Sequence, residues 1–162
     1  EVISNLHLGR IDEETTANIG LIEGGSARNA VPESANLKGE IRSRNTNKLE
    51  KHTEHFRETF EKVITNFEGA SLSLEIKREF DPYHLTNEHT IIQKILKIFE
   101  KMKIKASLEP TGGGSDVNIF NSRGIEIVVV GTGVHDMHTK REFVVTSEMM
   151  EAAQFCEQLI TF

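Results

Sequence analysis

The sequence predicts an α+β block followed by a segment of α/β type. Residues 36–44 alternate between apolar or small side chains and charged ones, the period-two pattern of a strand with one buried face. Residues 47–67 carry apolar side chains at helical spacing, with charged residues on the opposite face. Residues 125–130 form a nearly continuous β-branched run, which is typical of a central strand covered on both faces.

The first block is predicted to be an antiparallel sheet with helices on one face. Pro32 lies between the first two strands, which suits a turn between antiparallel neighbours. Asn47 is the expected cap of the long helix. In chain order we expect a helix end at 1–8, strands at 15–23 and 36–44, a helix at 47–67 and a strand at 70–80.

The second block alternates helices and strands, which predicts a parallel sheet. The expected elements are a helix at 87–103, a strand at 105–109, a Gly-rich turn at 111–116, a helix start at 117–120, a strand at 125–130 and a helix from about 147. Thr146 is the expected cap of that last helix. Its predicted buried side chains are Met149, Ala153, Cys156 and Ile160.

Composition excludes several classes of protein. The 162 residues carry a net charge of −6, which argues against nucleic-acid binding. No apolar run approaches the ~20 residues that span a bilayer. The one cysteine, Cys156, excludes an internal disulfide and suits a cytoplasmic protein. The first residues show no signal-peptide pattern and resemble the middle of a helix, so we expect the chain to be an excerpt of a longer protein.

The turn that holds Gly112, Gly113, Gly114 and Ser115 joins an expected strand to an expected helix. Glycines let a backbone approach a ligand closely, and the N–H groups at a helix start favour an anion. No Lys follows the glycines, so a nucleotide-binding P-loop is not expected. The alternative is a tight turn with Ser115 or Asp116 as the helix cap, and both interpretations are compatible.

His138 follows the expected strand 125–130, at the position where α/β folds place their sites. His135, Asp136 and Glu142 lie in the same segment, so four side chains of metal-ligand type cluster there. A single loop histidine is otherwise a surface or hydrogen-bonded residue. One imidazole is also no zinc site, because catalytic zinc takes three protein ligands and structural zinc takes four.

Asn29 lies in a polar turn and Arg42 in the strand that follows it. An amide and a guanidinium suit a substrate carbonyl or carboxylate. Composition alone favours the plainer interpretation of a turn asparagine and a solvent-facing arginine.

Four motifs occur in order: Gly-Gly-Ser-Ala-Arg-Asn-Ala-Val-Pro-Glu at 24–33, Lys-Gly-Glu-Ile-Arg-Ser at 38–43, Thr-Gly-Gly-Gly-Ser-Asp at 111–116 and His-Thr-Lys-Arg-Glu-Phe-Val at 138–144. Together they resemble the C-terminal half of a di-zinc peptidase of the aminoacylase and carboxypeptidase superfamily. Residues 8–20 are similar to its peptidase T, or tripeptidase, branch. The resemblance covers essentially the whole chain.

The resemblance implies a fold, a cofactor and partners. Residues 1–82 would be an α+β lid domain of the dimerisation type, incomplete at its N-terminus, and residues 83–162 the C-terminal segment of the α/β catalytic domain. The full-length enzyme would bind two zinc ions, with cobalt or manganese as alternatives. It would cleave short peptides and form a homodimer through the lid.

The resemblance also implies roles for single residues. His138 matches the family's last zinc ligand. Asn29 and Arg42 match lid residues that contact substrate, Arg42 at a carboxylate. Gly112, Gly113, Gly114 and Ser115 match the loop that lines the substrate site.

The chain departs from the family because the first metal motif, the bridging Asp, the paired Glu residues and a lid His are absent from it. One of those Glu residues is the general base, so no catalytic residue is expected within the chain, and alone it should be inactive. Two alternatives remain: a non-catalytic dimerisation or binding module derived from the family, and a second chain that supplies the missing half.

Overall fold

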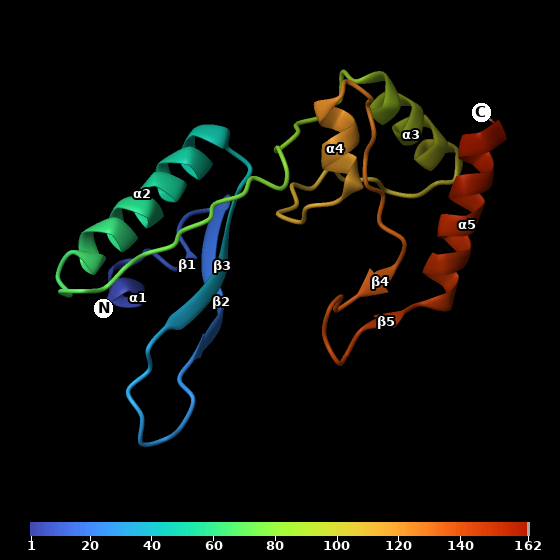
Figure 1. Ribbon diagram of the computed structural model, residues 1–162. Helices are drawn as coiled ribbons and strands as arrows, with labels where there is room; N and C mark the ends of the chain where they lie inside the picture. The colour runs from blue at the N-terminus through green and yellow to red at the C-terminus, as the bar shows by residue number, and fades with distance from the viewer. Residues whose placement is uncertain (162) are drawn as a thin grey trace. The chain divides into compact units, whose positions relative to one another are not determined.

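A computed structural model describes residues 1–161 and divides the chain into two compact units, Glu1–Pro82 and Tyr83–Phe162. The first unit contains helices α1 and α2 and strands β1, β2 and β3, and the second contains α3, α4, β4, β5 and α5 (Figure 1). Within residues 1–161, no helix is long and apolar enough to cross a membrane.

The first unit is built on an antiparallel sheet of order β1-β2-β3. Its strands are β1 (Gly9–Arg10), β2 (Thr15–Gly24) and β3 (Ala35–Ser43). β2 and β3 pair along their whole length, with a register shift between Ile19 and Leu21. Gly39 faces this irregularity, and a Cβ there would collide with the Asn18 carbonyl oxygen. A glycine is therefore what lets the two strands approach at the bulge.

Helix α1 (Val2–Asn5) is short, and α2 (Thr46–Ile64) is the long helix that the sequence predicts. The expected cap lies two residues too far along the chain. Asn45, and not Asn47, caps α2, because its side-chain oxygen accepts a hydrogen bond from the Lys48 N–H at 3.1 Å. A cap must precede the first helical residue, whereas Asn47 already lies in the first turn.

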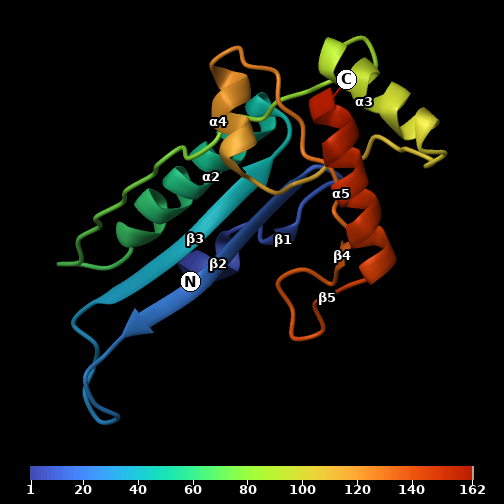
Figure 2. The same cartoon turned by 90° about the vertical axis from the view of Figure 1, so that its right-hand side faces the viewer.

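α2 covers one face of the sheet. The core of this unit joins Leu6, Ala17 of β2 and Phe56 of α2. The far half of the β2–β3 hairpin extends past α2 (Figures 1 and 2), and Leu21 and Ile22 are 52% and 62% exposed there. The predicted α+β class, with an antiparallel sheet and helices on one face, is confirmed.

Residues 70–80, expected to be a strand, are not a strand in the structure. The segment is mostly exposed and reaches α2 through Arg78, whose guanidinium lies 3.5 Å from the Glu50 carboxylate. A strand is defined by its ladder to a neighbour. Residues 1–161 offer this segment no partner strand, so its alternating apolar pattern stays unpaired.

The second unit packs helices around a small core. Ile95 and Ile98 of α3 (Thr90–Lys101) meet Phe155 of α5 (Thr146–Thr161), and Ile98 is completely buried. The Phe99 and Phe155 rings stack with centroids 4.7 Å apart. The other elements are α4 (Asp116–Ser122) and the antiparallel pair β4 (Val134–His135) and β5 (Phe143–Val144).

The predicted buried face of the last helix was wrong. Phe155 is buried, whereas Cys156 is exposed, and Met149 and Ile160 are 50% and 85% exposed. The helix carries two apolar stripes, and the stripe that includes Phe155 is the one that meets α3. Helical periodicity alone cannot choose between two such stripes.

The strands expected at 105–109 and 125–130 are also absent from the sheets of residues 1–161. Val128 and Val130 pack against the α3–α5 core, but Val129 between them is 55% exposed. Only one face of this run is covered. A central parallel strand has neighbours on both edges and cover on both faces, and within residues 1–161 this run has no neighbouring strand and only one covered face.

Candidate functional site

His138 lies at the tip of the loop that joins β4 to β5. The strands pair Val134 with Val144 and His135 with Phe143, which leaves residues 136–142 as the connection. The Thr139 N–H and hydroxyl both donate to the Asp136 carbonyl oxygen, at 3.2 and 2.8 Å. The Glu142 N–H donates to the Thr139 carbonyl at 3.2 Å. The loop is therefore held by its own hydrogen bonds.

Glu142 contributes to this loop through its side chain. Its Oε2 accepts a hydrogen bond from the His138 backbone N–H at 2.8 Å. His138 has φ of 65° and Asp136 has φ of 49°. Left-handed conformations are uncommon for residues other than glycine, so the surrounding bonds must compensate for their cost. The result is an exposed imidazole on a backbone of defined shape.

The other ligand-type side chains of this segment do not converge on His138. His135 Nε2 lies 2.7 Å from a carboxylate oxygen of Glu148 on α5, and its ring stacks on Phe143. Asp136 pairs with Arg141 at 3.3 Å. A Cβ on Gly133 would collide with Glu148, so this glycine permits the contact between the hairpin and α5.

Among the described residues, His138 could supply one ligand of a metal centre, but not a complete ligand set. Within residues 1–161, no three His, Cys, Asp or Glu side chains lie close enough to hold a metal ion. The imidazole of His138 is exposed, and a neutral imidazole is a preferred zinc ligand. Any metal that His138 binds must take its remaining ligands from outside the described residues.

The Gly-rich loop begins α4. The Ser115 N–H donates to Asn118 Oδ1 at 3.0 Å, and the Gly113 N–H donates to the Thr111 hydroxyl at 3.2 Å. Gly112 and Gly113 do not have positive φ, and a Cβ on Gly112 would meet nothing within 4 Å. Neither backbone conformation nor crowding within the described chain requires these two glycines. α4 and the β4–β5 hairpin lie apart in both views (Figures 1 and 2).

Arg42 lies near the base of the β2–β3 hairpin, where it pairs with Thr16. Its guanidinium contacts the carboxylate of Glu40, with Nη2 2.9 Å from Oε2. The side chains of Arg42 and Glu40 are 50% and 56% exposed. Strand geometry predicts that residues two apart share a face, so this neighbour was detectable in the sequence, although our reasoning from the sequence missed it.

Asn29 lies at the other end of the same hairpin. It is exposed in the turn between β2 and β3, where the Ala30 N–H donates to the Ala27 carbonyl at 3.2 Å. The paired region runs from Thr15↔Ser43 to Gly24↔Ala35. Arg42 lies within it, one residue from its first pair, and Asn29 lies in the turn beyond its last pair. At about 3.3 Å per residue this separates them by roughly 20 Å. The structure does not bring these two predicted site residues together within one chain.

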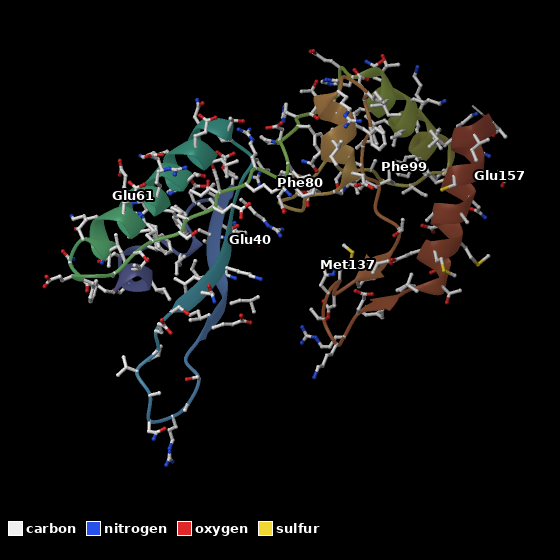
Figure 3. All side chains as sticks on the ribbon, in the orientation of Figure 1. Glu40, Glu61, Phe80, Phe99, Met137 and Glu157 are labelled. Atoms are coloured by element: carbon white, nitrogen blue, oxygen red, sulfur yellow. The ribbon has the colours of Figure 1, made fainter. Side chains whose placement is uncertain are left out.

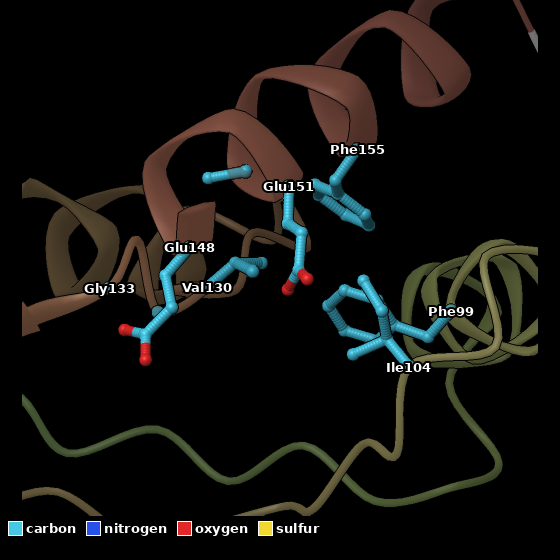
Figure 4. A pocket seen from close by; sticks show the side chains of 9 residues that line it. Phe99, Ile104, Val130, Gly133, Glu148, Glu151 and Phe155 are labelled. Atoms are coloured by element: carbon cyan, nitrogen blue, oxygen red, sulfur yellow. The ribbon is translucent and has the colours of Figure 1, made fainter. Parts of the chain in front are cut away.

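A shallow hollow of about 200 Å³ lies beside α5 in the second unit. Figure 4 shows Phe99, Ile104 and Phe155 on its apolar side and the carboxylates of Glu148 and Glu151 beside them. None of the predicted site residues lines it. It is therefore a feature separate from the His138 loop and the Gly-rich loop.

The comparisons with known proteins agree with this architecture. Residues 2–68 match the family model of the M20-type peptidase dimerisation domain. The crystal structure of aminopeptidase PepT from Bacillus cereus ATCC 10987 is 30% identical and superposes with a TM-score of 0.82, over 98% of this chain and 42% of that one. Over nearly its whole length the chain is therefore similar to part of a peptidase T. A tripeptidase from Staphylococcus aureus subsp. aureus Mu50 superposes with a TM-score of 0.88 at 28% identity, again over 98% and 42% of the two chains.

The chain also resembles a curated but uncharacterised protein, YqjE of Bacillus subtilis (strain 168), at 31% identity over 160 residues. That match covers 99% of this chain and 43% of the relative. The chain thus spans less than half of the length of each relative named here. The predicted resemblance to the peptidase T branch is confirmed.

Proposed function

We propose that this chain is part of a zinc-dependent aminopeptidase of the tripeptidase type, which hydrolyses short peptides. The observation that carries the proposal is the match of 98% of the chain to a solved aminopeptidase and a solved tripeptidase, with TM-scores of 0.82 and 0.88. In this proposal residues 1–82 form the lid and residues 83–162 belong to the catalytic domain. Cobalt or manganese are alternative metals.

In this proposal His138 holds one of two metal ions through a ring nitrogen. When bound, the metal would lower the pKa of a water molecule, so that a hydroxide nucleophile would be available near neutral pH. The exposed imidazole and the loop bonds around it support the assignment, since a ligand must be accessible and positioned. The other ligands and the general base would come from outside these 162 residues, so the chain alone would not cleave peptides.

In this proposal three parts of the chain contact the substrate. Arg42 would bind a peptide carboxylate through its guanidinium, which suits that anion by charge and shape. Asn29 would donate its amide to a substrate oxygen. The loop from Gly112 to Ser115 would line the site, and the absence of any steric or conformational need for its first two glycines within the chain supports close approach by a ligand.

The separation of Asn29 from Arg42 has a consequence for this proposal. A tripeptide spans about 10 Å when extended, which is less than the roughly 20 Å between the two residues. If both residues contact substrate, they would therefore serve different active sites of a dimer. A homodimer through the first unit is consistent with its match to a dimerisation domain.

His138→Ala in the full-length protein tests the proposal. We expect the loss of one bound metal equivalent by elemental analysis, together with loss of tripeptide hydrolysis. His135→Ala is the matched control, because that imidazole is occupied by Glu148. Normal metal content and normal rate in the His138 variant would refute the ligand assignment.

A second candidate is a non-catalytic dimerisation module, which the family match of residues 2–68 favours. Analytical ultracentrifugation of the full-length protein together with a metal assay separates the two. A stable dimer that binds no metal and cleaves no tripeptide would support the module.

A further inference from the structure

One face of the sheet in the first unit is polar and is not covered by α2. Glu40 and Arg42 lie two residues apart on β3 and share this face. Their direct partners on β2 are Asn18 and Thr16. The intervening residue Ile41 packs on the opposite side, against the core below α2. Figure 3 labels Glu40 on this strand.

The carboxylate of Glu40 occupies part of the Arg42 guanidinium, at 2.9 Å from Nη2. A guanidinium binds carboxylates through parallel N–H donors, and the same donors would be needed for the end of a peptide. Both side chains are about half exposed, and exposed ion pairs are weak. A substrate carboxylate could therefore displace Glu40 from Arg42, but Glu40 would compete with it for the guanidinium.

We infer that Glu40 is a specificity-determining residue that competes with the peptide carboxylate for Arg42. The inference rests on the proposed role of Arg42. A peptide with a free C-terminal carboxylate gains the Arg42 contact only by displacing Glu40. A peptide without that carboxylate meets no such competition. Glu40 therefore narrows the advantage that a free peptide carboxylate has over an uncharged end.

The test uses the full-length enzyme and two substrates, a tripeptide with a free C-terminus and the same tripeptide as its C-terminal amide. Glu40→Gln is expected to lower KM for the free acid and so to raise its kcat/KM about two- to five-fold. The kcat/KM of the amide should not change. Where the amide is not cleaved, its inhibition constant replaces KM. Glu33 is an exposed glutamate in the connection between β2 and β3, so Glu33→Gln is the matched control. It should change kcat/KM for neither the acid nor the amide.

A double-mutant cycle separates this inference from the role of Arg42. Arg42→Gln should raise KM for the acid alone, and adding Glu40→Gln to it should have no further effect, because the two residues act through one contact. If Arg42→Gln acts as expected but Glu40→Gln and Glu40→Ala both leave the acid-to-amide ratio unchanged, the inference about Glu40 is wrong. If Arg42→Gln itself leaves that ratio unchanged, the role of Arg42 fails, and the inference fails with it.

Discussion

Glu142 accepts a hydrogen bond from the backbone N–H of His138 at 2.8 Å, four residues before it in the chain. This carboxylate looks in the sequence like a second metal ligand. In the structure it holds the backbone of a residue with φ of 65°. Its contact is with the backbone that presents the imidazole and not with the imidazole itself.

Replacing Glu142 should weaken metal binding without removing a ligand. In the full-length protein we expect Glu142→Ala to lower zinc affinity by about ten-fold, in the range seen for residues that orient a ligand. Glu142→Gln keeps an oxygen acceptor and should recover most of the loss. Chelator competition measures the affinity, and Glu157→Ala on the exposed side of α5 is the control. Equal losses in the Ala and Gln variants would contradict the hydrogen-bond explanation.

Dimerisation should depend on the outer edge of β2. β1 pairs with only Thr16 and Ala17, so the edge from Asn18 onward has no partner strand within residues 1–161. Open edges of this kind pair with other chains. We expect Ile22→Lys to shift the full-length protein toward monomer in sedimentation velocity. Val31→Lys, at a 94% exposed position in the hairpin connection, should leave the dimer intact, and equal behaviour of the two variants would argue for another interface.

Mixed dimers should report whether one active site uses two protomers. If Asn29 and Arg42 serve different sites of the dimer, Asn29→Ala and Arg42→Gln homodimers are both impaired. A heterodimer of the two variants would then contain one fully intact site. Random reassociation of an equal mixture makes about half of the dimers heterodimers, so we expect about a quarter of the tripeptidase rate of the unmutated dimer, by this count of intact sites. If the mixture is no faster than either homodimer, then both residues contact the substrate from one protomer, or one of them does not contact it.

Acid should destabilise the first unit through Asp12. The Glu14 N–H donates to the Asp12 carboxylate at 2.9 Å, and Lys48 Nζ lies 3.1 Å away. The hydrogen bond from Glu14, with a smaller contribution from Lys48, lowers the pKa of Asp12 from 3.8 to about 2. Because the folded-state pKa is depressed, this stabilisation is present above pH 3.8 and is lost as the pH falls toward 2.

Asp12→Asn removes that titration. The difference between the urea midpoints of wild type and this variant should therefore shrink from pH 5 to pH 2. Glu33→Gln, which is exposed, should show no such convergence. A difference between wild type and Asp12→Asn that stays constant across this range would contradict the lowered pKa.

The core of the second unit should depend on Ile98. This side chain is completely buried against Ile95 and Phe155, so Ile98→Ala leaves a cavity and should cost about 3 kcal/mol of unfolding free energy. Ile160→Ala is the matched control, because the same truncation at an 85% exposed site should change stability by less than about 0.5 kcal/mol. Urea denaturation of the full-length protein measures both. A large loss at Ile160 would show that further parts of the protein bury it.

Elements with local signals were predicted well from the sequence. β2, β3 and α2 lie within a few residues of their expected positions, because their alternation, helical spacing and flanking polar residues are all local. Residues 70–80 and 125–130 have equally good strand patterns and form no strand. The pattern reports a preference, but the ladder requires a partner, and no partner lies within the described residues.

By itself the sequence determined the α+β class, the order of the motifs and the resemblance to peptidase T, because these depend on the identity and spacing of residues along the chain. Only the tertiary structure decided what those residues meet. It joined Glu40 to Arg42 and Glu142 to the backbone of His138, and it placed Asn29 and Arg42 at opposite ends of one hairpin. Register, turn conformation and strand length set these distances, and they arise only when the chain has folded.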